Sequence, residues 1–378
     1  MRICLIITSF TSGGAEVLVC NLAQAFLTAG HEATVVSLSH AAQVGNDPDV
    51  ERVMMERIVA AGGKACSLGL RNRNNILSGM FALRRILGEA SPDIIHAHTA
   101  RALPILALAR PAAPVVLTHH NSRLSFPPRA YRLFDRLVSS YVAISDQCAA
   151  QTRALARKPV RTILNAASPR FQAAAARERA SRDPIVLAVG TISTQKDYPT
   201  LIRAARPLAE TLARDGRRLR IRIAGGGQMI DSLRELARSE GVAEVVELLG
   251  SRSDVEQLMR EADVFANSSL WEGFSIAMIE ASMSGLPTVA TDVAGNCEMV
   301  IPDLNGELVP PSDPVALAGG IAAVLADDRR YGLLSRGALE AAKRFSIENC
   351  AEGHLALYRD VMPRSAVAAL KEARASAE

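Results

Sequence analysis

The sequence predicts an α/β protein built from two doubly wound domains. Its 378 residues are enough for two domains of ordinary size. Only 4% of the residues are aromatic although 49% are hydrophobic, so small aliphatic side chains must form the core, as in parallel sheets covered by helices. The order strand, glycine-containing loop, helix, strand occurs at the start of the chain and begins again near residue 185.

The first domain is expected to open with a strand at residues 3–8 and a loop that contains Gly13 and Gly14. Residues 15–29 carry apolar side chains at helical spacing, and Gly30 ends that helix. Short apolar runs predict further strands at residues 33–38, 93–98, 115–118 and 141–144.

The second domain is expected to begin after an Ala-rich, charged stretch at residues 173–183. Strands are predicted at 185–189, 219–224, 245–249, 263–266 and 287–291, with helices from about 199 and at 228–239, 254–262 and 274–284. We therefore expect Rossmann-like domains at residues 1–168 and 169–352. A helix at about 353–378 is expected to pack back on the first domain.

Composition excludes several classes of protein. The net charge of +4 is too small to indicate a nucleic-acid partner. The six cysteines are scattered, which favours reduced thiols in a cytoplasmic protein over a disulfide framework or a zinc site. The apolar run at residues 3–7 is too short for a signal peptide, and the uncharged run at 102–109 is far below the ~20 residues that span a bilayer.

Gly13 and Gly14 stand between a strand and a helix. Glycines there let the backbone approach a ligand, and the free N–H groups of a helix start attract anions. The segment is equally compatible with an ordinary turn. It lacks the G-x-G-x-x-G pattern, so it does not indicate a dinucleotide-dependent dehydrogenase or epimerase.

Residues 267–285 carry two acids eight positions apart, Glu272 and Glu280. Glu272 precedes the expected helix start, so the backbone N–H groups after it are expected to face a phosphate or pyrophosphate; they belong to Gly273, Phe274, Ser275 and Ile276. Glu280 stands among apolar residues, which argues against a solvated helix position. Two acids so placed can bind hydroxyls on both sides of a diphosphate, one on a sugar and one on a ribose.

Other candidate residues follow strands. Lys196 comes after the first strand of the second domain, where it can meet a phosphate or simply be solvated. His96 and His98 share one face of a strand, and His119 and His120 end another. A metal site there lacks acidic or cysteine partners, so we expect one histidine at each strand end to act as a donor or acid/base group.

A basic segment at residues 123–137 mixes arginines with bulky apolar side chains. It could contact an anionic membrane or a lipid phosphate, or it could be a salt-bridged surface helix. The arginines concerned are Arg123, Arg129, Arg132 and Arg136.

Taken together, these motifs resemble the retaining glycosyltransferases of family 4. The matching segments run in family order: 12–16 (SGGAE), 93–98 (DIIHAH), 118–121 (THHN), 189–197 and 271–281, which holds Glu272 and Glu280. The resemblance implies the GT-B fold, in which two Rossmann-like domains face each other across a cleft. It also implies transfer of a sugar from a nucleotide-sugar with retention at the anomeric carbon and no cofactor or metal.

The resemblance assigns roles by position. The loop of Gly13 and Gly14 would approach the diphosphate and Lys196 would neutralise it. Glu272 and the backbone after it would hold the donor sugar and phosphate, and Glu280 would take the ribose hydroxyls. His120 would contact the donor sugar near the reacting centre, with His119 as the alternative.

Two positions depart from the family pattern. Thr191 stands where an arginine is usual, so the diphosphate contact is in doubt, and Arg252 is a candidate substitute. Asn165 and Ala166 replace the usual Asn-Gly turn, which concerns only the linker.

The resemblance also implies partners. UDP is the favoured nucleotide, and the acceptor would be a glycan or lipid-linked glycan of a bacterial surface polysaccharide. The expected location is the cytoplasm, with a peripheral position at the inner face of the membrane as an option. The alternatives are a GDP-sugar-dependent mannosyltransferase and a non-catalytic nucleotide-sugar-binding scaffold.

Overall fold

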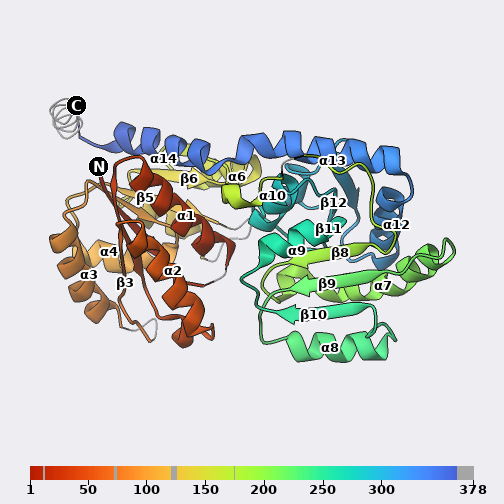
Figure 1. The fold of residues 1–378 in the computed structure, drawn as a ribbon. Helices are drawn as coiled ribbons and strands as arrows, with labels where there is room; N and C mark the ends of the chain where they lie inside the picture. The colour runs from red at the N-terminus through yellow and green to blue at the C-terminus, as the bar shows by residue number, and fades with distance from the viewer. Residues whose placement is uncertain (12, 72–74, 121–125, 174, 364–378) are drawn as a thin grey trace. The chain divides into compact units, whose positions relative to one another are not determined.

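The chain forms two compact units (Figure 1). This computed structural model describes residues 1–378 except 12, 72–74, 121–125, 174 and 364–378. Unit 1 consists of Met1–Asn165 together with the segment that starts at Ile347, and unit 2 is Ala166–Ser346. The units therefore meet in the sequence after residues 165 and 346, a few residues before the expected boundaries at 168 and 352.

Unit 1 contains a seven-stranded sheet in the order β3-β2-β1-β4-β5-β6-β7, and all neighbouring strands are parallel. The strands are β1 (Arg2–Ile7), β2 (Glu32–Ser37), β3 (Lys64–Ser67), β4 (Ile94–Ala97), β5 (Val115–His119), β6 (Ser140–Ala143) and β7 (Val160–Thr162). Every residue of β1 after Arg2 is buried, because helices cover both faces of a parallel sheet.

The helices of unit 1 are α1 (Gly14–Thr28), α2 (Pro48–Ala60), α3 (Ile76–Ala90), α4 (Leu103–Ala109), α5 (Tyr131–Phe134), α6 (Asp146–Leu155) and α14 (Ile347–Val361). Short 3-10 turns are η1 (Ala41–Val44), η2 (Ala100–Ala102) and η3 (Pro128–Ala130). The last helix, α14, returns to unit 1, where it packs against α1 (Figure 1). It begins six residues before the expected start at 353, and the end of the predicted C-terminal helix lies outside the described residues.

Unit 2 contains a six-stranded parallel sheet in the order β10-β9-β8-β11-β12-β13. Its strands are β8 (Ile185–Val189), β9 (Arg220–Ala224), β10 (Val246–Gly250), β11 (Val264–Asn267), β12 (Thr288–Thr291) and β13 (Gly306–Val309). Its helices are α7 (Tyr198–Ala213), α8 (Ile230–Ser239), α9 (Val255–Glu261), α10 (Ile276–Met283), α11 (Ala294–Cys297), α12 (Pro314–Leu325) and α13 (Asp328–Ala342), with 3-10 turns η4 (Pro169–Phe171), η5 (Thr194–Lys196) and η6 (Lys343–Phe345).

Both units have the predicted α/β class, with parallel sheets and crossover helices. Most of the buried core side chains are aliphatic, as the scarcity of aromatic residues implies: a core cluster of unit 2 contains Val186, Leu201, Ile221 and Val264, all completely buried. No helix in the described part of the chain is both long and apolar enough to cross a membrane.

Candidate functional site

The carboxyl ends of the unit 2 strands carry an ion pair between Lys196 and Glu272. Lys196 ends η5, the turn after β8, and Glu272 lies in the loop between β11 and α10. Since β8 and β11 are adjacent, the two loops emerge side by side, and Lys196 Nζ contacts Glu272 Oε1. The side chains are only 17% and 6% exposed, so water screens this pair weakly.

Neutral groups hold the Glu272 carboxylate in place. Ser269 Oγ donates a hydrogen bond to Oε1 at 2.7 Å, and Gln195 Nε2 donates to Oε2 at 3.3 Å. Gln195 also donates to the Trp271 carbonyl at 3.0 Å, which ties the two loops together. Both oxygens of the carboxylate thus have partners within the protein.

The backbone around Lys196 is fixed in the same way. Ser268 Oγ donates to the Lys196 carbonyl at 2.8 Å. The hydroxyl of Tyr198, the first residue of α7, donates a hydrogen bond to the Gly190 carbonyl at 3.0 Å. This bond ties the start of α7 to the end of β8. A lysine held at a strand end is suited to neutralise a phosphate.

Helix α10 begins directly after this loop. It starts at Ile276, two residues later than expected, with Ser275 as its N-cap residue. The Ser275 side chain makes no capping hydrogen bond, and the first turn holds no acidic residue. The first N–H groups of the helix therefore have no acceptor from the Ser275 side chain or from an acid of the first turn, and with the helix dipole they favour an anion. Gly273 and Phe274 are buried in the turn before it.

Glu280 is buried in the middle of α10. It is 8% exposed, and every residue of that helix except Ala277 is also buried. Burial raises the pKa of the Glu280 carboxyl to about 8, although Arg170 acts in the opposite direction. At neutral pH this carboxyl is mostly protonated, so it can donate as well as accept a hydrogen bond. The structure thus agrees with the sequence argument against a solvated position.

Glycines bring the strand-end loops of unit 2 together. A Cβ atom on Gly225 would lie 1.9 Å from the Gly190 carbonyl oxygen, and one on Gly295 would lie 2.5 Å from the Gly273 oxygen. No side chain fits at either position. The backbone of α11 therefore packs directly on the loop that carries Glu272, a contact that sequence reasoning missed.

Thr191, which stands where the family usually has an arginine, lies apart in the fold from Arg252, the candidate substitute. Thr191 is exposed and directly follows Gly190 at the end of β8. Arg252 follows β10, two strands away from β8 at the edge of the sheet. Its guanidinium is paired with Asp254, with Nε 2.8 Å from Oδ1. Because Arg252 already has an acid partner, its use as a substitute would require that pair to open.

In unit 1 the glycine loop carries an acid that the sequence argument overlooked. Helix α1 begins at Gly14 with Gly13 as its N-cap residue. The Glu16 side chain folds back so far that a Cβ atom on Gly13 would lie 2.5 Å from its Oε2. Burial raises the pKa of Glu16 to about 7. The helix start expected to attract a phosphate thus has a carboxyl group of its own.

Three histidines of unit 1 form a row at neighbouring strand ends: His96, His98 and His120. His96 Nδ1 hydrogen-bonds with the Tyr358 hydroxyl and Nε2 with Thr118 Oγ1, both at 2.7 Å. His98 Nδ1 hydrogen-bonds with His120 Nε2 at 2.9 Å. The His119 ring instead lies beside Phe126, with ring centroids 5.4 Å apart and planes inclined by 49°.

Burial lowers the pKa of all these imidazoles, to about 3 for His120 and about 4 for His119. They are therefore neutral at pH 7. Within the described part of the chain, no group of three or more metal-ligating side chains is gathered as a metal site.

The basic segment is not one continuous helix. It contains η3 and the one-turn helix α5, with Tyr131 and Phe134 buried beneath them. Arg129, Arg132 and Arg136 are exposed, and so is Leu133 at 62%. Arg123 lies outside the described residues.

Unit 1 has a cavity of about 560 Å³ at the carboxyl ends of β1, β2 and β4. Apolar side chains form most of its wall, among them Leu70, Ile105, Phe126 and Phe134, and Arg101, Ser39 and Thr99 supply polar groups. This edge of a parallel sheet is where α/β folds bind ligands.

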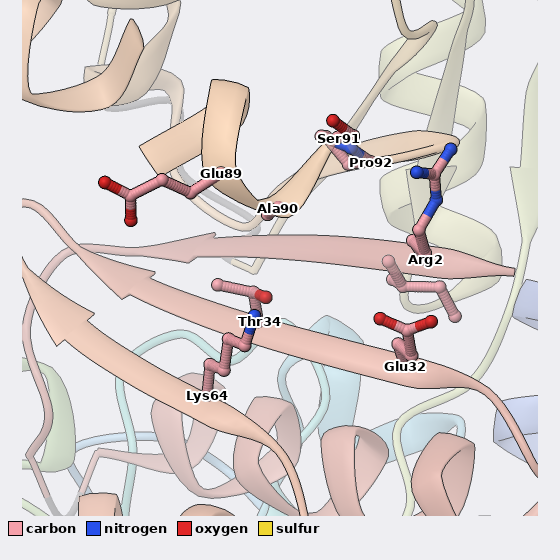
Figure 2. Close-up of a pocket in the computed structure, with 9 residues that line it drawn as sticks. Arg2, Glu32, Thr34, Lys64, Glu89, Ala90, Ser91 and Pro92 are labelled. Carbon is pink, nitrogen blue, oxygen red and sulfur yellow. The ribbon is translucent and has the colours of Figure 1, made fainter. Parts of the chain in front are cut away.

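A smaller cavity of about 300 Å³ lies at the opposite edge, where the strands begin, and Figure 2 shows Arg2, Glu32 and Lys64 around it. Arg2 is already paired there with Asp93 at 2.8 Å. We assign no part of the site to it.

Comparison with known proteins identifies the family. A family model described as glycosyl transferases group 1 matches residues 170–344, and one described as glycosyltransferase family 4 matches residues 12–171. The chain belongs to glycosyltransferase family 4. Together the two models span residues 12–344, which lie in both units.

Curated relatives carry glycosyltransferase names. The D-inositol 3-phosphate glycosyltransferase of Nocardia farcinica is 33% identical over 277 residues, which are 71% of this chain and 61% of that protein. The putative glycosyltransferase EpsF of Bacillus subtilis is 27% identical over 316 residues, 77% of this chain and 79% of that protein. The family 4 chain spans only 61%, 46% and 43% of three of the curated relatives that it matches.

Solved structures support the fold of the family 4 chain. Anabaena HepE, solved in complex with UDP, superposes with a TM-score of 0.75 at 21% identity over 94% of this chain and 99% of that one. A TarM variant of S. aureus, solved with Fondaparinux, alpha-GlcNAc-glycerol and UDP, gives 0.79 at 13% identity over 95% and 100%. The predicted GT-B class is therefore confirmed.

Proposed function

We propose that this protein transfers a sugar from a nucleotide-sugar, preferably a UDP-sugar, to a glycan or lipid-linked glycan, with retention of configuration and without a metal ion. The observation that carries the proposal is the shielded Lys196–Glu272 pair beside the uncapped start of α10. It combines a cation, a carboxylate and unpaired N–H groups, which are the groups that a sugar diphosphate requires.

The chemistry assigned to unit 2 is stabilisation of a leaving group. When the anomeric C–O bond breaks, negative charge develops on the nucleotide diphosphate. Lys196 and the N–H groups of Ser275 and Ile276 are held ready for that charge, which is electrostatic preorganisation. Glu272 binds hydroxyls of the donor sugar and, through its pair, fixes the position of Lys196.

Glu280 and the glycine loop complete the donor site in this proposal. The protonated Glu280 carboxyl can donate to one ribose oxygen and accept from the neighbouring hydroxyl. Gly13 and Gly14 are proposed to bind a phosphate at the start of α1, and Glu16 must then be protonated or move aside, since its carboxylate would repel that phosphate.

Unit 1 is the proposed acceptor domain. Its 560 Å³ cavity offers apolar walls for an aglycone or sugar ring and one cation, Arg101. A small phosphorylated polyol is a second candidate acceptor, because several relatives are named D-inositol 3-phosphate glycosyltransferases and Arg101 could bind a phosphate.

UDP is preferred because HepE and TarM were solved with UDP. GDP is the runner-up and would make the protein a mannosyltransferase. A role in bacterial surface polysaccharide synthesis, a cytoplasmic location and contact of Arg129, Arg132 and Arg136 with anionic lipid belong to the same proposal.

Binding and turnover test the proposal separately. The full chain is screened by thermal shift with UDP, GDP and ADP, and then assayed for UDP release from UDP-glucose and UDP-N-acetylglucosamine with and without lipid-linked glycan acceptors. We expect UDP to raise the Tm most and acceptor-dependent UDP release to follow. Stabilisation by GDP alone would favour the mannosyltransferase, and binding without release under any condition would favour the scaffold.

A further inference from the structure

A hydrogen bond joins two histidines at neighbouring strand ends of unit 1. His98 follows β4 and His120 follows β5, which are paired in register. Their Nδ1 and Nε2 atoms are 2.9 Å apart, and the ring centroids lie 5.2 Å apart with planes inclined by 20°. Because both imidazoles are neutral, the bond contains one hydrogen atom, which belongs to one of the two rings.

This bond couples the tautomers of the two rings. If His98 donates from Nδ1, its Nε2 is bare and His120 must carry its hydrogen on Nδ1. If His120 donates from Nε2, its Nδ1 is bare and His98 must carry its hydrogen on Nε2. The two outer atoms, His98 Nε2 and His120 Nδ1, are both buried and have no hydrogen-bond partner among the described residues. Either arrangement therefore leaves one unpaired N–H group.

The surroundings favour one arrangement. His98 is 7% exposed, and the His96 ring covers it with centroids 4.0 Å apart. His96 cannot accept a hydrogen bond from His98, because both of its ring nitrogens already bond with Thr118 and Tyr358. An unpaired N–H on His98 would stay unpaired, and burying a donor without an acceptor is unfavourable. His120 is less buried than His98 as a residue, although its Nδ1 atom is covered by protein in this structure, so an N–H there is the one that a small shift of its surroundings brings within reach of a substrate.

We propose that His98 is a positioning residue: it donates its Nδ1 hydrogen to His120 Nε2 and thereby places the only hydrogen of His120 on Nδ1, where it donates to a sugar hydroxyl. The inference rests on the proposed function together with the role that the family resemblance implies for His120, contact with the sugar near the reacting centre. His98 itself touches no substrate. Its role is to fix both the ring plane and the hydrogen of His120, as a partner behind a functional histidine does in other sites.

The tautomer can be observed without any activity assay. Two-bond proton–nitrogen correlation spectra of the full chain, labelled with nitrogen-15 at histidine, distinguish the two neutral forms. A His120→Asn variant assigns the signal. We expect the Nδ1–H form for His120 in the wild type. The Nε2–H form would overturn the inference, and this readout holds whether or not the protein turns over a UDP-sugar.

Kinetics test the consequence for turnover. His98→Leu removes the donor, and His98→Asn keeps an N–H group near the position of Nδ1. We expect kcat for UDP release from the active UDP-sugar to fall about ten- to a hundredfold in His98→Leu, with the KM for that donor changed less than about threefold. His98→Asn should recover most of kcat. Unchanged kcat in a folded His98→Leu variant would overturn the inference.

His354 provides the matched control. It is a further buried, neutral histidine beside this row, with its ring centroid 5.3 Å from that of His96, and its Nδ1 donates to the Cys350 carbonyl at 2.8 Å. His354→Asn is expected to lower the Tm but to leave kcat and the tautomer of His120 unchanged. A loss of kcat in His354→Asn equal to that in His98→Leu would show a general packing effect and overturn the positioning role. If His98→Leu does not fold, the wild-type tautomer and His98→Asn still decide.

Discussion

Lys196 Nζ contacts Glu272 Oε1 across two loops that follow adjacent strands, and Ser269 and Gln195 hold the carboxylate from the other sides. The pair is shielded from water, so neither charge is well solvated on its own. Whatever binds at the start of α10 therefore meets a cation whose position depends on its acid partner.

Lys196→Met should separate the catalytic from the structural role of this pair. The change leaves the Glu272 carboxylate buried without its counter-charge, which costs about 3 kcal/mol of stability and lowers the Tm. The leaving diphosphate also loses its cation, so kcat should fall about 10²–10³-fold. Thermal denaturation and UDP-release assays measure the two effects.

A double variant, Lys196→Met with Glu272→Gln, is the control for stability. Removing both charges should restore most of the Tm while kcat stays low. Recovery of kcat together with the Tm would show that Lys196 acts only by supporting the fold.

Glu280→Gln should change how stability depends on pH. The pKa of Glu280 is about 8 in the folded protein, above its ordinary value of 4.5, so the folded state holds this proton more tightly than the unfolded state. The wild type therefore loses stability from this group as pH rises from 4.5 to about 8. Glutamine cannot ionise, so the Tm of the variant minus that of the wild type should increase across this range and then level off. A constant difference would contradict a protonated Glu280.

Glu280→Ala should weaken UDP binding about tenfold, because it removes hydrogen bonds to the ribose. Isothermal titration calorimetry measures this affinity, and Glu280→Gln, which keeps a donor and an acceptor, is the matched control. Equal UDP affinity in the alanine variant and the wild type would remove the ribose assignment.

Gly295→Ala should distort the donor site, because the new side chain in α11 would press on the loop that carries Glu272. The added Cβ would lie 2.5 Å from the Gly273 oxygen and 2.9 Å from the Glu272 oxygen, so the loop must shift. We expect a lower Tm and weaker UDP binding. Gly319→Ala is the control: this exposed position in α12 has nothing within 4 Å of the new atom, and the helix should gain about 0.5–1 kcal/mol. The prediction is wrong if both variants behave alike.

We expect the exposed arginines Arg129, Arg132 and Arg136 of unit 1 to bind anionic lipid weakly and in a salt-sensitive way. In liposome flotation with phosphatidylglycerol vesicles, the variant Arg129→Glu/Arg132→Glu/Arg136→Glu should lose the binding that the wild type shows at low salt. Vesicles of phosphatidylcholine alone are the control. Equal flotation of variant and wild type would exclude this surface.

The sequence predicted the central strands of both sheets but missed β3, β7 and β13. All three lie at sheet edges and have three or four residues, and β3 and β7 contain no fully buried position. The hydrophobic signal that reveals a strand comes from burial on both faces, and such edges lack it.

The site was predicted less completely than the fold. Spacing on an apolar helix was enough to place Glu280 in the interior, and its raised pKa follows from that burial. The folded-back Glu16 and the His98–His120 bond depend on side-chain rotamers and, for the histidines, on the pairing of β4 with β5, so no local pattern indicates them. The Lys196–Glu272 contact joins positions 76 apart, and only the neighbourhood of β8 and β11 reveals it.

The return of α14 to unit 1 has a consequence for synthesis on the ribosome. Tyr358 completes the hydrogen bonds of His96, a residue made more than 250 positions earlier. Unit 2 is continuous, so it can fold as soon as its last α-helix, α13, has left the exit tunnel. Unit 1 must wait, with the surface beneath α14 uncovered, until residues 347–361 have emerged as well. The half of the protein that is translated first is thus the half that is finished last.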